Sequence, residues 1–486
     1  MRFIAKIIAF LTILLLLPWA LKAQGVLPAG NPEFDFLYDR LERRDALSRD
    51  SAAYQLAPYS LELASPELGP FGWLNSLEPS ELRLFGRLDE DFRSVKEEDA
   101  VGYESLRGGG AARPLDNVFV YGSFSLDEQL AKDPTYTGKK WRGLAGGVDE
   151  AFVQFRTGGL SAMVGRFASF WGPRNSFVIS NGVSMDGLGY SYAWGRLTLS
   201  YRLARLDGLN PDIDPVTQFE NRYLAAHRLD IRLSRAFKIG LFESIVFGGP
   251  GRQVELYYLN PILPFHFAQL NDGIDDNTFL GFDFAYEPGW NTKFYGQLFI
   301  DDFQVDDKAQ TDKEPNEIGL IAGFYAADLL PSLDVKAEYS RVTNRTFNQV
   351  HPRNKYLYKD ELIGGALGND YDLIDLRVIK WLTDGLYSAA RLSYHRQGEG
   401  DPSDEWTTPW MDVDSDYSEP FPTGTVEKNL TAALQLKGFM WRHLFVDITG
   451  GVERIRNFDN VGGDDRTLPF VNLTVSMFAS SRIGVE

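Results

Sequence analysis

The stretch HRLDIRLS, residues 227–234, carries the pattern that decides the fold. Leu229, Ile231 and Leu233 alternate there with polar residues, which include Arg228 and Asp230. Alternate side chains of an extended chain point to opposite faces, so this segment has one apolar face and one charged face. A period of two residues therefore predicts a strand whose two faces meet different surroundings.

The same alternation recurs from about residue 81 to the end of the chain, for example in residues 197–204, 333–341 and 471–477. We count about 16 to 18 such segments, separated by turns rich in Gly, Asn, Asp and Pro. No helical segment interrupts them, which excludes a parallel α/β sheet. The sequence thus predicts an all-β fold of antiparallel strands in residues 81–486.

The composition excludes several classes of site and partner. The chain has 486 residues and no cysteine, so it has neither a disulfide framework nor a thiolate metal site. Its formal net charge is −18, and a partner attracted by charge alone is therefore not nucleic acid. The 5 histidines are scattered, without the spacing of a zinc site. We expect no metal and no cofactor.

The N-terminus has the pattern of a secretory signal peptide over residues 1–23. A positively charged start with Arg2 and Lys6 precedes the apolar run Ile7–Leu17, and cleavage is expected after Ala23. The alternative is an uncleaved anchor, which is disfavoured because a spanning helix needs about 20 apolar residues. We expect an exported mature chain with no transmembrane helix.

Residues 24–80 are predicted to form a short helical segment on the periplasmic side. Within it, residues 31–46 begin with a plausible N-cap, Asn31, followed by Pro32 in the first turn. Apolar residues recur there at helical spacing, and the other face is charged. This pattern favours a helix that covers one end of the main domain over a helix that docks a partner.

Alternation alone does not separate a soluble sandwich or propeller from a membrane barrel. An exported chain without a spanning helix can still cross a membrane as a closed antiparallel barrel, which satisfies every backbone group in lipid. Strands of about ten residues fit a tilted crossing, and aromatic residues near strand ends suit an interfacial girdle. Those residues include Phe247, Trp290, Trp381 and Trp441. We therefore expect a closed antiparallel transmembrane β-barrel of about 16–18 strands in the outer membrane.

The inward face of such a barrel is crowded with charges of both signs, including Arg166, Arg228 and Asp301, although Val164 and Phe167 leave the face of Arg166 open. Opposite charges on neighbouring strands cross-link a barrel wall, which is one account of these residues. Ligand binding is the other account. Arginine forks and carboxylates bind sugar hydroxyls or acidic substituents, and aromatic faces stack on sugar rings. These three residues are therefore candidate polysaccharide-binding residues.

The acidic insertion DPSDEWTTPWMDVDSDYSE, residues 401–419, is predicted to be an extracellular loop. Trp406 and Trp410 are unusual for a loop that is only solvated, and they are candidates to stack on a sugar or to act as a lid. The carboxylate pairs of the chain, such as Asp301-Asp302, fit solvated turns better than calcium sites. The chain lacks the sequence motifs of common hydrolases, phosphate-binding loops and dinucleotide sites, which leaves a membrane-embedded Asp/His or Ser/His hydrolase as the remaining, least favoured enzyme alternative.

The segment VGRFASFWGPRNSFVIS, residues 164–180, breaks its alternation at Trp171-Gly172-Pro173-Arg174. The break predicts a turn or re-entrant segment that places an indole beside a guanidinium, where a glycan or a neighbouring carboxylate can meet them. Trp171 and Arg174 are thus further candidate polysaccharide-binding residues. The favoured alternative is a structural corner, held by packing of Trp171 and an ion pair of Arg174.

An ordered series of short motifs is similar to a known family. Along the chain the series is Val164-Gly165-Arg166, Trp171-Gly172-Pro173, Asn221-Arg222-Tyr223, His227-Arg228-Leu229, Phe247-Gly248-Gly249, Tyr258-Leu259-Asn260-Pro261, Gly281-Phe282-Asp283 and Ile300-Asp301-Asp302-Phe303. Together with the opening Phe36-Leu37-Tyr38-Asp39-Arg40-Leu41, this order resembles the Wzi-type capsule-assembly family of outer-membrane proteins. The bulky Arg174 and Asn175 depart from the smaller residues expected after the turn.

The resemblance implies a barrel of about 18 strands, closed on its periplasmic side by helical segments. It also implies a lectin-like surface protein, not an enzyme, that helps to attach or assemble capsular polysaccharide or exopolysaccharide. Its partners are then that polysaccharide, the lipid bilayer of the outer membrane and, during biogenesis, the barrel-assembly machinery. The alternative is an outer-membrane diffusion channel, selective for carbohydrate, with the same wall but an open lumen.

Overall fold

The computed structural model describes residues 26–27, 36, 39, 43, 56–57, 59–60, 77–79, 81–96, 100–133, 136, 138–180, 182–208, 220–272, 275–303, 313–414 and 417–484. The predicted signal peptide and most of the predicted N-terminal helix lie outside these residues. The first long strand of the wall begins at Glu81.

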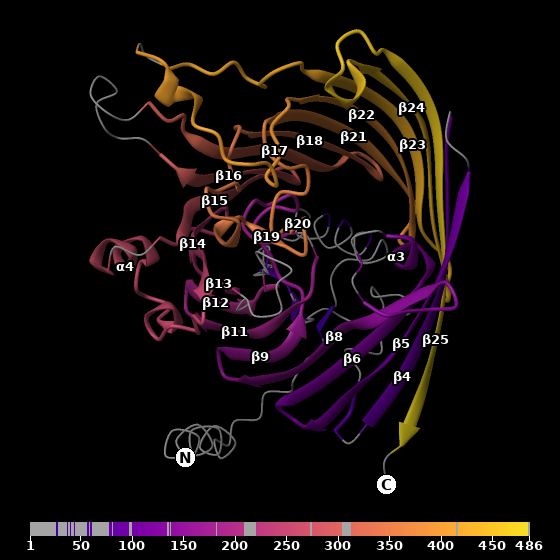
Figure 1. Ribbon diagram of the computed structural model, residues 1–486. Helices are drawn as coiled ribbons and strands as arrows, with labels where there is room; N and C mark the ends of the chain where they lie inside the picture. The colour runs from indigo at the N-terminus through magenta and orange to yellow at the C-terminus, as the bar shows by residue number, and fades with distance from the viewer. Residues whose placement is uncertain are drawn as a thin grey trace.

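Eighteen long strands form one closed antiparallel barrel, in which each strand pairs with the next long strand along the chain and the last pairs with the first (Figure 1). These strands are β4 (Glu81–Val95), β5 (Val101–Leu115), β6 (Val118–Asp127), β8 (Leu144–Thr157), β9 (Leu160–Phe167), β11 (Met185–Trp194), β12 (Leu197–Arg205), β13 (Glu220–Arg232), β14 (Phe237–Pro250), β15 (Asn277–Gly289), β16 (Thr292–Asp302), β17 (Glu317–Leu330), β18 (Leu333–Val342), β21 (Tyr371–Thr383), β22 (Leu386–Gln397), β23 (Glu427–Trp441), β24 (Leu444–Arg456) and β25 (Arg466–Gly484).

Short elements extend this wall or lie between its strands. The short strands are β1 (Val26–Leu27), β2 (Leu56–Ala57), β3 (Tyr59–Ser60), β7 (Lys140–Trp141), β10 (Phe170–Trp171), β19 (Leu357–Tyr358) and β20 (Glu361–Leu362). The described helices are α3 (Glu128–Lys132) and α4 (Phe265–Asp272), with 3-10 turns η2 (Tyr257–Leu259), η3 (Pro352–Asn354), η4 (Pro409–Asp412) and η5 (Phe458–Asn460).

The two ends of the barrel differ in how the strands are connected. At one end the strands meet in short turns, such as Trp290-Asn291 between β15 and β16, where both residues have a φ of 53°. Left-handed φ at both central residues is the turn geometry that matches the twist of a hairpin. At the other end lie long connections, among them residues 251–276, 343–370 and 398–426. Outer-membrane barrels have short periplasmic turns and long extracellular loops, so we name the two ends accordingly.

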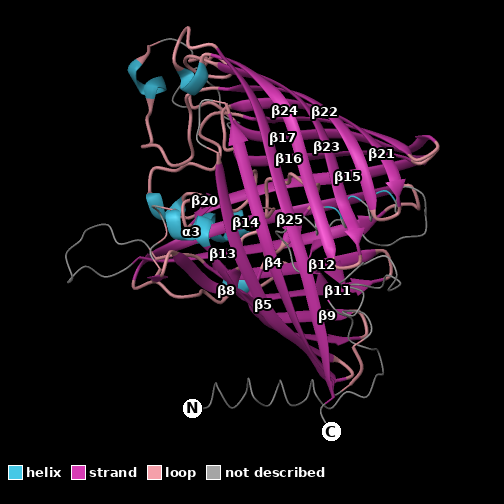
Figure 2. Ribbon diagram, turned by 90° about the vertical axis from the view of Figure 1, so that its right-hand side faces the viewer, coloured by secondary structure: helices cyan, strands magenta, loops and turns pink. Residues whose placement is uncertain are grey.

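The apolar face of the strands is the outer face of the barrel. The strands are clearly tilted in the wall (Figure 2). In β13, Arg228 and Asp230 are buried on the lumen side, whereas Leu229 between them is partly exposed. Large apolar side chains are exposed on the outer wall, for example Leu280 (44%) and Leu434 (70%). No helix in the described part of the chain is long and apolar enough to span a membrane. Because leucines face outward and charged side chains face inward, the alternation has the orientation expected of a membrane barrel.

Aromatic side chains lie along the periplasmic rim of the outer wall. Trp194, Trp290 and Trp441 occupy strand ends or turns there and are 71%, 86% and 69% exposed. Indole rings suit the boundary between lipid and water. The predicted girdle therefore holds for Trp290 and Trp441. The girdle prediction is wrong for Phe247, which α4 covers on the outer wall, and for Trp381, which packs inside the lumen.

The lumen contains a hydrophobic core, built where two chain segments enter the barrel. Residues 168–184 between β9 and β11 meet residues 343–370 between β18 and β21, and Figure 1 shows β19 and β20 inside the ring of strands. Phe177 and Phe347, one from each segment, are fully buried against Phe299 of the wall. This part of the lumen is thus filled by side chains.

Candidate functional site

Residues 168–184 form a re-entrant segment with Trp171 at its centre. Trp171 is 5% exposed in the lumen core, and its backbone N–H donates to the Ile179 carbonyl at 2.9 Å. Gly172 has a φ of 96°, and a Cβ added there lies 2.7 Å from Nε2 of Gln297, so this turn requires glycine. The predicted turn is therefore present, and its indole is packed rather than displayed.

Arg174 and Asn175 fasten the re-entrant segment to its surroundings. Nη1 of Arg174 donates to Oδ1 of Asp39 at 2.5 Å, and Nδ2 of Asn175 donates to Oε1 of Glu338 at 2.5 Å. The Tyr295 hydroxyl donates to the other oxygen of Glu338 at 2.6 Å. These contacts are those of the structural corner, and the two bulky side chains both find carboxylate partners.

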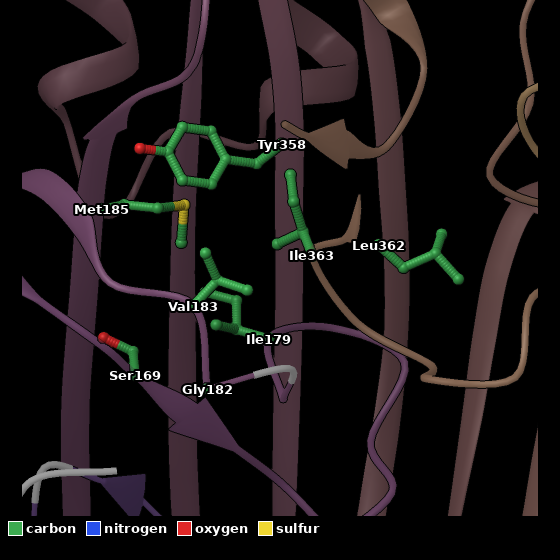
Figure 3. A pocket seen from close by; sticks show the side chains of 8 residues that line it. All are labelled: Ser169, Ile179, Gly182, Val183, Met185, Tyr358, Leu362 and Ile363. Carbon is green, nitrogen blue, oxygen red and sulfur yellow. The ribbon is translucent and has the colours of Figure 1, made fainter. Parts of the chain in front are cut away.

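The re-entrant segment packs directly against the extracellular connection that carries β19 and β20. The Ser180 N–H donates to the Ile363 carbonyl at 3.1 Å, and the Gly365 N–H donates to the Ser176 carbonyl at 3.0 Å. Figure 3 shows the pocket that remains between the two segments, with apolar lining side chains such as Tyr358 and Ile363. Its volume of about 10 Å³ admits about one water molecule, so a sugar ring does not fit.

Phe36, Asp39 and Arg43 of the N-terminal segment contact side chains inside the barrel. Phe36 is fully buried, with its ring 5.6 Å from that of Tyr387 and 5.8 Å from that of Trp381. The Tyr387 hydroxyl donates to Oδ2 of Asp39 at 3.0 Å, and the other oxygen of Asp39 accepts from Arg174. The N-terminal segment and the re-entrant segment are therefore in direct contact.

Arg43 adds a second polar contact between the N-terminal segment and the wall. Its Nη2 lies 2.7 Å from Oδ1 of Asp328, and its Nε lies 3.1 Å from Oδ2 of Asp334. The guanidinium carbon is also 5.3 Å from the centre of the Trp381 ring. Because the Asp334 side chain is fully buried, the pairing with Arg43 compensates a charge that is costly to desolvate.

Arg228 lies at the centre of a buried charge network in the wall. Its Nη1 and Nη2 donate to the two oxygens of Asp283 at 2.5 and 2.7 Å, and its Nε donates to Asp230 at 2.9 Å. Arg228 is 0% exposed. Its guanidinium therefore cross-links strands β13 and β15, as the structural account of the lumen charges expects.

The other two lumen candidates lie apart from Arg228 and from each other. Asp301 stands at the extracellular end of β16, where its Oδ2 accepts the Phe347 N–H at 2.6 Å and so anchors the connection that enters the lumen. Arg166 shares a strand face with the exposed Val164, and its Nη1 donates to Oδ2 of Asp186 at 3.1 Å. The structure thus places Arg166 on the outer face and not in the lumen.

The extracellular loops bring aromatic and charged groups together. The rings of Trp406 and Trp410 meet edge to face at 6.2 Å, and Tyr417 lies 6.3 Å from Trp410. The Arg345 guanidinium is 4.9 Å from the Trp410 ring centre and donates to both oxygens of Glu419 at 2.8 and 2.9 Å. Trp410 is 6% exposed, whereas Trp406 is partly exposed. We call these five residues the tryptophan cluster.

The connections 343–370 and 398–426 are bonded into one extracellular unit. Nζ of Lys355 donates to the Asp404 carbonyl at 2.6 Å, and the Asp370 carboxylate accepts the Thr423 N–H at 3.0 Å. Burial lowers the pKa of Lys355, and the nearby Asp404 offsets only part of this. Burial also raises the pKa of Asp370, against the hydrogen bonds from Thr423 that lower it. Hydrogen bonds between the two connections therefore hold the tryptophan cluster in place.

Sequence reasoning found part of this unit. Trp406 and Trp410 come together as neighbours, and Tyr417 and Glu419 belong to the same acidic insertion. Arg345 was missed because it is 74 residues from Glu419 and no local pattern pairs them. Within the described residues, no group of three or more histidine, aspartate or glutamate side chains is arranged to hold a metal ion.

Comparison with known proteins places this architecture in a family. A family model described as capsule assembly protein Wzi matches residues 122–469. The structure is similar to Wzi of Escherichia coli, an outer membrane protein involved in group 1 capsule assembly and a carbohydrate binding beta-barrel. The TM-score is 0.61 at 14% sequence identity, over 93% of this chain and 99% of that chain.

Two structures from Pseudomonas aeruginosa are more distant. OprD has a TM-score of 0.47 at 10% identity, over 83% of this chain and 96% of its own. OpdK with vanillate has a TM-score of 0.48 at 12% identity, over 82% and 99%. No curated protein sequence gives a significant match. Because the matched residues cover well over half of its length, the chain belongs to the capsule assembly protein Wzi family.

Proposed function

We propose that this chain is a lectin-like protein of the outer membrane that binds capsular polysaccharide or exopolysaccharide and helps to attach or assemble it at the cell surface. The tryptophan cluster carries the proposal, because it presents the partly exposed Trp406 indole at the extracellular end, on a buried Trp410 that contacts the Arg345 guanidinium. Family membership supports the same class of ligand, since Escherichia coli Wzi is a carbohydrate binding beta-barrel.

The cluster has the chemistry that sugars require. An aromatic face stacks on the apolar face of a sugar ring, and Trp406 is the partly exposed indole. Trp410 is buried beneath Trp406 and contacts the Arg345 guanidinium. Trp410 therefore holds Trp406 in position and does not contact the ligand itself. Exposed carboxylates in the same loop, such as Asp401 and Glu405, are acceptors for sugar hydroxyls.

Four other candidate residues stabilise the segments and the wall on which this surface rests. Trp171 and Arg174 fix the re-entrant segment, and Asp301 anchors the connection 343–370 through the Phe347 N–H. Arg228 braces the wall. We therefore propose direct ligand contact for Trp406 and supporting roles for these four residues, with Arg166 outside the binding surface.

The filled lumen favours a binding barrel over a diffusion channel. The lumen core joins the re-entrant segment, the connection 343–370 and the wall, and Phe36 of the N-terminal segment is buried inside the barrel as well. We propose that residues 24–80 form the helical periplasmic segment after cleavage of a signal peptide, residues 1–23. We further propose that the barrel, residues 81–486, is inserted by the barrel-assembly machinery and acts by binding, not by catalysis.

The test is a pair of loop variants with different positions in the cluster. We expect Trp406→Ala to weaken binding of purified surface polysaccharide about threefold to tenfold, because aromatic stacking contributes about 0.5–1.5 kcal/mol. Met411→Ala is the matched control, since Met411 is 76% exposed in the same loop and outside the cluster. Equal affinity of the Trp406→Ala protein and the unaltered protein would contradict the proposed surface.

Two further measurements separate the binding barrel from the channel. Purified protein in planar bilayers is expected to show no stable conductance steps, because side chains of the re-entrant segment and of the connection 343–370 obstruct the lumen. Large and steady single-channel steps would favour the channel instead. A deletion strain is expected to lose cell-bound polysaccharide, and normal retention would count against the attachment role.

A further inference from the structure

The connection between β14 and β15 folds back over the outside of the barrel wall. Its residues Tyr258, Phe265 and Ala268 are buried against wall residues that include Ala225 and Phe247. The strand neighbours of those wall residues point the other way, into the lumen core. Figure 1 likewise shows α4 beyond β14, away from the centre of the ring. This connection therefore covers the face of the wall that elsewhere meets lipid.

Polar bonds fix the connection to the wall in one position. Glu243, on the outward face of β14, accepts the N–H groups of Phe265 and His266 at the start of α4, at 2.7 and 2.8 Å. Nε2 of His227, opposite Glu243 on β13, lies 3.1 Å from the same carboxylate. The Tyr201 hydroxyl donates to the Tyr258 carbonyl at 2.6 Å. Without this cover, Glu243 and His227 would face acyl chains, which is costly for ionisable groups.

Large apolar side chains are exposed on the outer surface of the connection. Leu256, Ile262 and Phe267 are 74%, 79% and 60% exposed. The chain has no aspartate, glutamate, lysine or arginine from residue 256 to residue 271, although 24% of its residues are charged. The extracellular insertion 401–419 is by contrast rich in acidic residues. A loop in water has no reason to exclude charge in this way.

The exposed side chains are continuous with the lipid-facing wall. Leu280, on the outward face of β15, pairs in register with Glu243, the residue that holds the start of α4, and is 44% exposed. Leu241, two residues before Glu243 on the same outward face of β14, is 46% exposed. Toward the extracellular end, the outer face becomes charged at Arg166 and Asp186. The connection thus lies where the apolar belt meets the extracellular boundary.

We propose that residues 256–271 are a membrane-embedded flap that inserts Leu256, Ile262 and Phe267 among the acyl chains of the outer leaflet. The occupant of this surface is lipid, because the surface extends the lipid-facing belt and carries no charge. An apolar face with a polar back is the pattern of a segment that lies in the membrane interface. The flap fixes the height and orientation of the barrel in the bilayer. This proposal does not depend on the identity of the ligand at the tryptophan cluster.

The chain contains no cysteine, which allows a direct test with single spin labels. Ile262→Cys and Phe267→Cys carry a nitroxide in the full-length protein, reconstituted in vesicles of phosphatidylcholine and phosphatidylglycerol. Leu280→Cys is the lipid-facing control, and Met411→Cys is the extracellular control. Heat-modifiable migration in gels confirms that each variant is folded before it is measured.

Oxygen, which concentrates in lipid, is expected to relax the labels at Ile262 and Phe267 as strongly as the label at Leu280. A water-soluble nickel chelate is expected to relax them far less than the label at Met411. Nickel access equal to that of Met411 at both flap positions would overturn the proposal. Spin–spin broadening that disappears on dilution with unlabelled protein would overturn it as well, because it assigns the surface to a second copy of the chain.

Discussion

The pairing of Arg345 with Glu419 predicts how firmly the extracellular unit is held together. Arg345 belongs to the connection 343–370 and Glu419 to the connection 398–426, and their side chains are only 8% and 14% exposed. Arg345 has a φ of 70°, so replacing it also alters the backbone preference. The cleaner perturbation is therefore Glu419→Gln, which keeps the shape of the side chain but removes its charge and one strong acceptor.

The expected cost follows from the two hydrogen bonds of 2.8 and 2.9 Å. A hydrogen bond to a charged group contributes about 1.5–3 kcal/mol, and removing one partner of a fully buried pair costs about 3–5 kcal/mol. Because both side chains keep some solvent contact, we expect a cost within the range for a hydrogen bond to a charged group and below that for a fully buried pair. A cost of about 2 kcal/mol raises the population of the open loop about 30-fold.

Hydrogen exchange read by mass spectrometry measures this opening. The N–H groups of Thr423 and Gly400, which donate to Asp370, are expected to lose protection in the Glu419→Gln protein. Peptides from the strands of the wall are expected to remain protected. Asp412→Asn is the control, since Asp412 is an exposed carboxylate in the same connection. If both variants leave loop exchange unchanged, or change it equally, the reasoning about the Arg345–Glu419 pair is refuted.

Three further outcomes follow from other contacts. Arg228→Met leaves Asp283 buried without its guanidinium partner and is expected to destabilise the barrel by about 3–5 kcal/mol. The measurement is the urea concentration at which the protein unfolds in detergent, which should decrease. Unchanged stability would contradict the stabilising role of the Arg228 charge network. Gly172→Ala, at a φ of 96°, is expected to cost more than about 1 kcal/mol and to increase protease cleavage in the re-entrant segment, whereas equal resistance would refute the close fit. Burial raises the pKa of Asp370 above its ordinary value of 3.8, so the folded chain binds a proton there more tightly than the unfolded chain does. The stability of the loop is therefore expected to increase as the pH falls through the raised pKa toward 3.8, and to decrease as the pH rises through the raised pKa. The protection factor of the Thr423 amide, which is its exchange rate corrected for the intrinsic effect of pH, is expected to change across this window in the unaltered protein but not in Asp370→Asn.

The sequence predicted the barrel because the alternation that identifies each strand lies within that strand. The period of two residues in residues 227–234 is a property of each strand alone, and it survives whatever the neighbours are. The sense of the alternation followed from export without a spanning helix, and the exposed Leu280 and Leu434 agree with it. At the periplasmic end, pairing of consecutive strands then required only short turns, such as Trp290-Asn291.

The contacts that were not predicted depend on which strands lie side by side. Arg228 and Asp283 are 55 residues apart, and their pairing follows from the register of β13, β14 and β15 rather than from either local pattern. Phe247 looked like a girdle residue because its strand end is aromatic, but the flap covers it. The absence of charge between residues 256 and 271 was the available signal for that cover.

The re-entrant segment also gives the barrel a mechanical property. It is bonded to the extracellular connection through Ser180 and Gly365, and to the N-terminal segment through the contact of Arg174 with Asp39. A pulling force on the extracellular connection is therefore shared with the re-entrant segment and the N-terminal segment. The hydrogen-bonded ladders of the wall form a ring without a free edge, so no single strand can be peeled away under this load.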